Sequence, residues 1–423
     1  CRYFQTPYLY KENGFKEKEE AKKLIAVLKE GTSPLTCRIV SIEKKKEKKN
    51  PPLLFNLAEL QNECSKRFKI SPDETLRIVQ ELYEKKLVTY PRTDARVLST
   101  AVSKEITKNL NGLSKYQMAA PYMQDILHYG AYKNLAKTRY VNDKQITDHY
   151  AIIPTGQGLS ALNSVSATAH HVYDVIVRRF LSIFYPPAVY QKVALVTQIG
   201  KEQFFSNFRV LAEEGYLKVA GVPAPKKNAN GNDAEGDGSD NNVDLDAAFF
   251  ASIQKLKKGD ILDVKSLDIK EGETSPPKRY NSGSMILAME NAGQLIEDED
   301  LREQIKGSGI GTSATRAEIV KKLVSNKYIA LNKKTQIVTP TLTGEMIVNV
   351  VSASIGSLLN PTLTASWEKG LTYVAEGSVT EEEYMQKLDK FVTQKTNIVK
   401  QNNFQYQLRQ SFDQIAPYYQ KKK

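Results

Sequence analysis

Between residues 53 and 90, apolar side chains recur every three or four positions, as they do along one face of an α-helix. The spacing predicts two helices in this stretch. The second has its own start signal, because Ser71 is followed by Pro72 at the first helical position and by Glu74 three residues on. Helical patterning then continues, with interruptions, to about residue 186.

Alternating apolar and polar residues, many of them β-branched, predict strands elsewhere in the chain. The expected strands are 35–42, 192–199, 204–211 and 259–267. Residues 222–244 are rich in Pro, Gly, Asn and Asp with almost no large apolar side chain, so we expect a flexible loop there. A polar helix precedes the first strand, and after Pro276-Pro277 the helical pattern returns, with a hairpin around residues 328–341.

This order predicts a multidomain protein, mainly α with a β-rich hinge domain. A chain of 423 residues is too long for one ordinary core. Residues 1–52 look incomplete by themselves, so we place them with 187–275 in one discontinuous β-rich domain. Residues 53–186 and residues 276–423 are expected to form two helical domains.

Lysine and arginine outnumber aspartate and glutamate by 60 to 48, which gives a net charge of +12. Cationic side chains that displace counterions from a phosphate backbone gain free energy, so nucleic acid is the leading partner class. The alternative is that the lysine-rich stretches 44–49 and 421–423 are solvated faces or tails, which is the commoner role of a charge run.

Three cysteines, Cys1, Cys37 and Cys64, match neither a zinc pattern nor a disulfide framework, which favours a reducing cytoplasm. No run of about 20 apolar residues is present, so we expect no membrane partner. Because the chain begins with Cys1 rather than Met, we interpret it as a piece of a longer protein.

The first motif with chemical potential is Tyr90-Pro91-Arg92, which directly follows the second predicted helix. Pro91 favours an extended Tyr90, and in extended chain residues i and i+2 project on the same side. A tyrosine oxygen can attack a phosphodiester while a neighbouring guanidinium stabilises the charge that develops on the phosphate oxygens. Alone, the tripeptide is more often a turn with a surface arginine.

A second motif, Asp148-His149-Tyr150, precedes the apolar residues 151–153 and contains one of only four histidines in the chain. A histidine beside a phosphate can donate a hydrogen bond or hold a proton. An isolated histidine is, however, at least as often a structural residue.

A third motif is the glycine-rich stretch 307–318, which leads into an amphipathic helix. Its polar residues are Thr312, Ser313, Thr315 and Arg316. Exposed amides at a helix start can hold phosphate, and Thr315 with Glu318 can form a capping box, which explains the polar residues equally well. The lysine of a nucleotide-binding P-loop is absent.

These motifs occur together with two others, in a definite order. The series is 51–61, 82–94, 148–155, 309–316 and 363–371. In content and order it resembles the type IA DNA topoisomerases, most closely the topoisomerase III branch, from about residue 35 to about residue 395. The resemblance implies a toroidal gate built from domains II, III and IV of that family.

The resemblance also implies residue roles. Tyr90 corresponds to the nucleophile that holds a 5′ phosphate, and Arg92 to the arginine that stabilises the scissile phosphate. His149 corresponds to a histidine near the cleavage site, although Thr147-Asp148 and Tyr150 depart from the family pattern. Thr312, Ser313, Thr315 and Arg316 correspond to positions along the path of single-stranded DNA. Trp367 can stack on a base or, more commonly for a lone tryptophan, pack in a core.

Members of this family bind Mg²⁺ in an N-terminal Toprim domain, and no acidic cluster of that kind occurs in the segments expected to fold. We therefore expect a monomeric, cytoplasmic fragment associated with the bacterial nucleoid. It should hold no metal itself, bind single-stranded DNA weakly and cleave poorly alone. A helicase partner is not readable from the sequence, nor is the choice between DNA and RNA or between relaxation and decatenation.

A non-catalytic single-strand-binding clamp remains the alternative. A tyrosine recombinase or relaxase also forms phosphotyrosine, but needs either several Arg and His residues around the tyrosine or a metal-binding histidine cluster, and the four scattered histidines argue against it.

Overall fold

The computed structural model describes residues 2–3, 14–30, 34–221, 243–244, 247–273, 276–295 and 309–419. The chain divides into two compact units, the first formed by Cys1–Pro52 with Leu181–Pro277 and the second by Leu53–Phe180 with Lys278–Lys423. Nearly all of the predicted loop 222–244 lies outside the described residues. Each unit combines segments that are far apart in the sequence, and the first is β-rich while the second is helical, in keeping with the predicted fold class.

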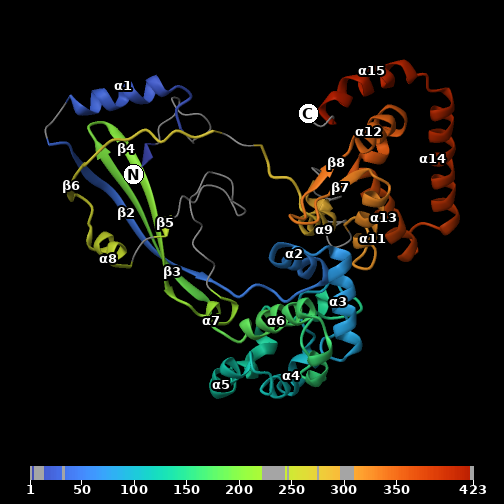
Figure 1. Ribbon diagram of the computed structural model, residues 1–423, viewed down its shortest axis with the longest axis horizontal. Coiled ribbons are helices and arrows are strands. Elements are labelled where there is room, and N and C mark those ends of the chain that lie inside the picture. Colours follow the sequence, from blue (N-terminus) through green and yellow to red (C-terminus); the bar gives the residue numbers. More distant parts are fainter. Residues whose placement is uncertain are drawn as a thin grey trace. The chain divides into compact units, whose positions relative to one another are not determined.

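The first unit is built on an antiparallel sheet with strand order β1-β4-β3-β2-β6, and β5 pairs in parallel with β4 (Figure 1). The strands are β1 Arg2–Tyr3, β2 Thr36–Lys49, β3 Ala188–Ile199, β4 Glu202–Glu213, β5 Val243–Asp244 and β6 Ile261–Asp263. Its helices are α1 Lys18–Lys29, α7 Leu217–Ala220 and α8 Ala247–Lys255.

Strand β2 extends well beyond the predicted strand 35–42, because it continues through the lysine-rich stretch 44–49. Every residue from Ser41 to Lys49 has a partner on β3, ending with Lys49 opposite Ala188. Glu47 lies 3.2 Å from Lys192 of β3 and 3.3 Å from Arg209 of β4, which offsets part of the positive charge. Pairing with distant strands therefore orders a stretch whose composition alone indicates a solvated run.

Three small apolar cores in the described residues stabilise this sheet, and one of them joins Ala188 of β3 to Tyr216 and to Leu217 of α7. Another joins Leu28 of α1 to Cys37, Ile199 and Phe204 of the strands, and the third joins Phe250 and Ile253 of α8 to Val193. Burying each of the Leu, Ile, Val and Phe side chains contributes about 1.5–3 kcal/mol. Among the described residues, short helices rather than a second sheet therefore pack against it.

The second unit contains most of the helices. They are α2 Leu57–Phe68, α3 Pro72–Glu84, α4 Thr100–Leu113, α5 Ala120–Tyr129, α6 Ala167–Ser182, α9 Ser282–Glu290, α11 Arg316–Ser325, α12 Leu342–Ile355, α13 Pro361–Ala375, α14 Glu381–Gln401 and α15 Gln405–Ile415. Short 3₁₀ segments are η1 Ala131–Lys137, η2 Asp143–Gln145, η3 Leu159–Ser164, η4 Ala292–Leu295, η5 Gly356–Leu359 and η6 Ala416–Tyr419. The predicted hairpin is present as β7 Ile329–Leu331 and β8 Val338–Pro340.

The start of α3 is as the sequence predicts. The hydroxyl of Ser71 accepts a hydrogen bond of 3.1 Å from the Glu74 N–H, and Pro72 occupies the first turn. Such a cap contributes about 1 kcal/mol to helix stability. It fixes where α3 begins and, with the helix length, where the chain reaches Tyr90.

Helix α9 packs closely on α2 although more than 200 residues separate them in the chain. A Cβ atom on Gly283 would lie 2.6 Å from the Cα of Asn62, and the hydroxyls of Ser65 and Ser282 are 3.2 Å apart. Ile286 and Ala58 are buried in the same contact. This packing joins the two segments predicted as separate helical domains into one compact unit.

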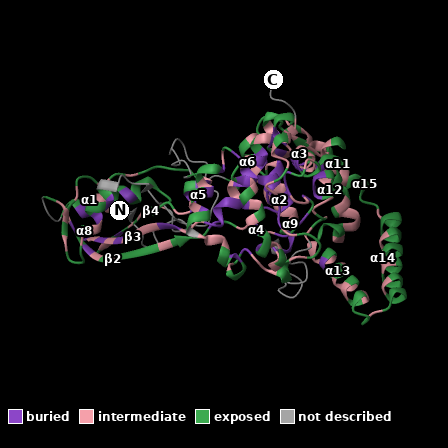
Figure 2. Ribbon diagram, turned by 90° about the horizontal axis from the view of Figure 1, so that it is seen from below, coloured by how far each residue is buried: buried purple, intermediate pink, exposed green. Residues whose placement is uncertain are grey.

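The helices from α12 to α15 are far more exposed than those around α2, α6 and α9 (Figure 2). Trp367 packs edge-on against Tyr384 and Phe391 of α14, with ring centroids 5.5 and 5.7 Å away. In the described part of the chain, one helical stretch, Leu342–Ala375, is long and apolar enough to cross a membrane. It comprises α12, η5 and α13, and Asn360 caps a new helix start inside it, so it is not one continuous helix.

We predict that Gly344→Ala destabilises the second unit. A Cβ at this position would lie 1.9 Å from the carbonyl oxygen of Tyr328, so the free energy of unfolding should fall by about 1–3 kcal/mol in urea denaturation. Gly356→Ala is the matched control, because nothing lies within 4 Å of its Cβ, and it should change stability by less than about 0.5 kcal/mol. Equal losses of unfolding free energy in the two variants would contradict the close approach of Gly344 to the Tyr328 carbonyl.

Candidate functional site

The segment that carries Tyr90 begins where α3 ends. Lys86 adopts a positive φ of 61°, and the Leu87 N–H donates to the Leu82 carbonyl at 2.9 Å, which closes the helix and turns the chain. Leu87 is buried, whereas Tyr90 is half-buried. The tyrosine thus stands where the chain leaves the core.

A second segment runs beside it and carries His149. Backbone and side chain of Thr89 both bond to Ile153, with the Thr89 N–H donating to the Ile153 carbonyl at 3.0 Å and the Ile153 N–H donating to the hydroxyl at 2.9 Å. The Thr93 hydroxyl donates to the His149 carbonyl at 2.7 Å. Threonines on either side of Tyr90 therefore hold the two predicted motifs together.

This pairing places the rings of Tyr90 and His149 in contact. Their centroids are 4.3 Å apart with an interplanar angle of 42°, and Tyr83 meets Tyr90 edge-on at 5.5 Å. His149 is exposed. An imidazole beside a phenol can hold the proton that a tyrosine loses when its oxygen attacks.

Arg92, two residues after Tyr90, is exposed. Among the described residues its guanidinium forms no ion pair within 4.0 Å. A guanidinium in this position can take two oxygens of a phosphate with parallel hydrogen bonds. The structure therefore brings together Tyr90 and His149 by direct contact and presents Arg92 to solvent next to them.

The described part of the glycine-rich motif begins at Gly309, so Gly307 and Ser308 lie outside the described residues. Thr312 and Thr315 are exposed. The Thr312 N–H donates to the Thr315 hydroxyl at 2.9 Å, and the Arg316 N–H donates to the Thr312 carbonyl at 3.0 Å.

These bonds correct one expectation about this loop. Thr315 is the N-cap of α11 but its side chain makes no capping bond, because its hydroxyl is occupied by Thr312 behind it. The predicted capping box with Glu318 does not form; Glu318 lies near Lys321 at 3.5 Å. Ser313 is half-buried.

Arg316, predicted to lie on the DNA path, is buried with an exposed fraction of 1%. Its Nη1 donates to Asp94 Oδ1 at 2.9 Å and lies 3.9 Å from Glu290 Oε1. Burial raises the pKa of the Glu290 carboxyl, the Arg316 charge acts against this rise, and Asp94 adds to it.

A cavity of about 230 Å³ lies beside Asp94 and Glu290, the two acidic partners of Arg316. It is lined by Asn56, Glu59, Asp94, Arg96, Glu290 and Asn291. Sequence reasoning missed Asn56 and Glu290, although an asparagine directly before the helical pattern of α2 is a readable capping signal, whereas Glu290 has no local signal.

The carboxylates of this cavity do not suit Mg²⁺. Arg96 pairs with Glu59 at 2.6 Å, and Arg316 pairs with Asp94. In the described ranges of the chain, no group of three or more His, Cys, Asp or Glu side chains is arranged to hold a metal ion. A carboxylate whose charge is already neutralised by an arginine attracts a metal cation only weakly.

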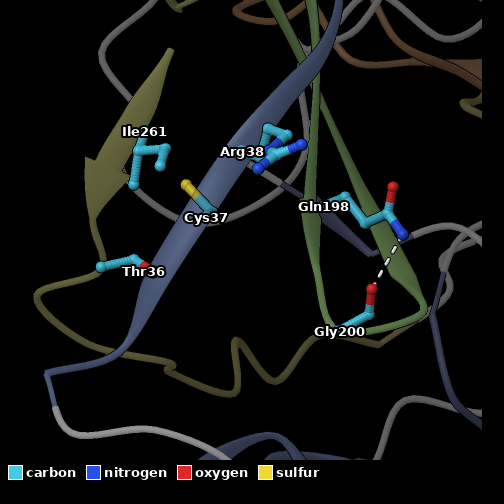
Figure 3. Close-up of a pocket in the computed structure, with 6 residues that line it drawn as sticks. All are labelled: Thr36, Cys37, Arg38, Gln198, Gly200 and Ile261. Carbon is cyan, nitrogen blue, oxygen red and sulfur yellow. Dashed lines mark hydrogen bonds between the residues drawn. The ribbon is translucent and has the colours of Figure 1, made fainter. Parts of the chain in front are cut away.

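A second cavity, of about 360 Å³, opens at the sheet of the first unit (Figure 3). Gln198 donates to the Gly200 carbonyl at its edge at 2.8 Å, and burial raises the pKa of the Cys37 thiol that lines it. It contains none of the predicted site residues and presents no reactive pair.

Comparison with known proteins gives the context of this site. A family model described as DNA topoisomerase matches residues 4–386. The protein named DNA topoisomerase 3 from Bacillus licheniformis is 33% identical over 369 residues, which are 86% of this chain and 47% of that protein. The Bacillus subtilis protein of that name is 32% identical over 369 residues, which are again 86% of this chain and 47% of that protein. A Bacillus cereus protein of that name is 29% identical over 400 residues, which are 93% of this chain and 51% of that protein. The chain thus spans about half the length of the curated relatives it matches.

Among solved structures, full-length topoisomerase I from Thermotoga maritima matches with a TM-score of 0.61 and 21% identity, over 91% of this chain and 55% of that one. This likeness shows the fold, which is that of the type IA topoisomerases. Because the family model covers most of its length, the chain belongs to the DNA topoisomerase family.

We predict that the effect of Glu290→Gln on stability depends on pH. A raised carboxyl pKa means that the folded state binds the proton more tightly, so ionised Glu290 destabilises the fold as pH rises above the ordinary value of 4.5. The variant should therefore gain stability relative to the parent between pH 4 and pH 7.5 in urea denaturation. Gly356→Ala, which changes no charge, is the control and should show the same pH dependence of stability as the parent. A loss of stability of Glu290→Gln relative to the parent over this pH range would show that the Arg316 charge outweighs burial at the Glu290 carboxyl.

Proposed function

We propose that this chain is the strand-cleaving gate portion of a type IA DNA topoisomerase, with Tyr90 as its nucleophile. The observation that supports this most directly is the half-buried Tyr90 ring in contact with His149 at 4.3 Å, on a segment held between Thr89 and Thr93. A rigidly held phenol at the edge of the core suits attack on a bound strand.

The proposed step is a transesterification. The Tyr90 oxygen forms a bond to phosphorus while the bond from phosphorus to the 3′ oxygen breaks. The phenol proton passes toward His149 or solvent, and the leaving 3′ oxygen takes up a proton to become a hydroxyl. The 5′ phosphate stays on Tyr90, and reversal of the step reseals the strand without ATP because the phosphoester bond is conserved.

The polar residues beside Tyr90 and in the glycine-rich loop each take a role at the strand. Arg92 stabilises the charge on the phosphate in the transition state, a contribution that typically amounts to about 10²–10³ in rate for a single donor. Thr312, Ser313 and Thr315 contact the backbone of the single strand, which positions it without reading its sequence. The net charge of +12 supports strand binding.

We also propose that Mg²⁺ takes part, supplying charge neutralisation at the phosphate when bound. We place its ligands outside this chain, in an N-terminal Toprim domain of the kind that binds Mg²⁺ in the family that the sequence resembles. Relatives about twice as long offer sequence for such ligands. The chain alone should then bind single strands weakly and cleave them poorly or not at all, as a monomer of the cytoplasm.

The alternative, a non-catalytic clamp for single-stranded nucleic acid, uses the same positive net charge but needs no reactive tyrosine. The half-exposed Tyr90 and the exposed Arg92 favour the enzyme, because a clamp gives no reason for this pair to face solvent beside a histidine.

We predict that Tyr90→Phe abolishes covalent capture of DNA. The chain is fused to the parts of the Bacillus subtilis relative outside the matched segment, given Mg²⁺ and an oligonucleotide labelled at its 3′ end, and quenched with denaturant. The parent should yield a labelled protein, and the variant should lose at least about 10³-fold of it, since the attacking oxygen is gone.

Tyr83→Phe is the matched control, because Tyr83 packs against Tyr90 at 5.5 Å and should retain capture. The unfused chain, run alongside, should give little or no adduct. Strand binding without any adduct in the fused parent would favour the clamp.

A further inference from the structure

The side chain of Arg316 is buried rather than presented to solvent. Its exposed fraction is 1%, and in the described residues it is the one buried residue with a charged side chain. A guanidinium without solvent needs anionic or carbonyl partners throughout, because an unpaired buried charge is strongly unfavourable. Its contacts therefore show which parts of the fold it holds.

Those contacts come from three separate segments. Nη1 donates to Asp94 at 2.9 Å, four residues after Tyr90. Nε donates to the carbonyl of Ile310 in the glycine-rich loop at 3.3 Å, and Glu290, the last residue of α9, lies 3.9 Å away. One cation thus links the nucleophile segment, the loop and α9.

Asn56 strengthens the same junction from the start of α2. Its Nδ2 donates to the Asp94 carbonyl at 3.1 Å and to Glu290 Oε1 at 2.7 Å, while its Oδ1 accepts from the Glu59 N–H at 2.9 Å. Asp94 is therefore held by its backbone as well as by its carboxylate. The end of the Tyr90 segment cannot shift without breaking both.

The glycine-rich loop is fixed to α9 at its other end. Gly309 has a φ of +60°, and a Cβ there would lie 2.5 Å from the carbonyls of both Met289 and Glu290. The Ile310 N–H donates to the Met289 carbonyl at 2.7 Å. The loop then presents Thr312 and Thr315 outward while its position depends on Arg316 behind it.

We propose that Arg316 is a positioning residue that locks the strand-binding loop to the Tyr90 segment through Asp94, so that a single strand bound along the loop meets the tyrosine oxygen. The proposal rests on the proposed function for the role of Tyr90. It replaces the expectation that Arg316 itself touches nucleic acid, and it assigns Asp94 and Glu290 to the same coupling.

The test uses the whole chain and needs no strand cleavage. 3-Fluorotyrosine is placed at position 90 alone, and its ¹⁹F resonance is recorded with and without a fluorescent oligothymidylate whose affinity is measured by anisotropy. Asp94→Asn keeps the shape but removes the anionic partner, and Asp94→Glu restores it. Lys321→Met is the control, because it removes an exposed positive charge from the same helix.

We expect Asp94→Asn to leave oligonucleotide affinity within about twofold of the parent while shifting or broadening the Tyr90 resonance, with recovery in Asp94→Glu. Arg316→Met should behave like Asp94→Asn. If Arg316→Met does not fold, the comparison of Asp94→Asn with Asp94→Glu tests the proposal by itself. Lys321→Met should leave the resonance unchanged.

Two results would overturn the proposal. One is a loss of affinity of about tenfold or more in Arg316→Met without a change in the Tyr90 resonance, which would make Arg316 a direct contact. The other is an unchanged resonance in both Asp94→Asn and Arg316→Met. Failure of the parent chain to bind any strand would count against the proposed function instead, and the coupling would still be read from the free protein.

Discussion

The buried charge of Arg316 is the constraint on which this part of the structure depends. A guanidinium inside a protein must be surrounded by acceptors, and no single helix can supply them. Asp94, Glu290 and the Ile310 carbonyl come from three different segments, and the ion pair with Asp94 spans 222 residues. Satisfying this one side chain brings α9, the glycine-rich loop and the Tyr90 segment to a common point.

Close backbone packing makes that convergence possible. Gly283 lets α9 approach α2, and Gly309 lets the loop pass over the end of α9, where any side chain would collide with backbone atoms. On the other side, Thr89 and Thr93 fasten the Tyr90 segment to the strand-like stretch after His149. Tyr90 is therefore positioned from both directions by groups that do no chemistry themselves.

Local signals in the sequence predicted a good part of this. The start of α3 at Ser71 follows from a cap that involves neighbours only, and the strands 192–199 and 204–211 follow from alternation. The extension of β2 through the lysines was not predicted, because it depends on pairing with β3 more than 130 residues away. The burial of Arg316 was not predicted either, since an arginine after a glycine-rich loop indicates a phosphate contact until Asp94 is seen beside it.

The central claim is that the Tyr90 oxygen forms the covalent bond to DNA. Its most direct test is to digest the trapped adduct of the fused protein and identify the nucleotide-bearing peptide by mass spectrometry. The account predicts one modified residue, Tyr90, carrying a 5′ phosphate. An adduct on Tyr83 or any other residue would contradict it, and so would a bond through the 3′ phosphate.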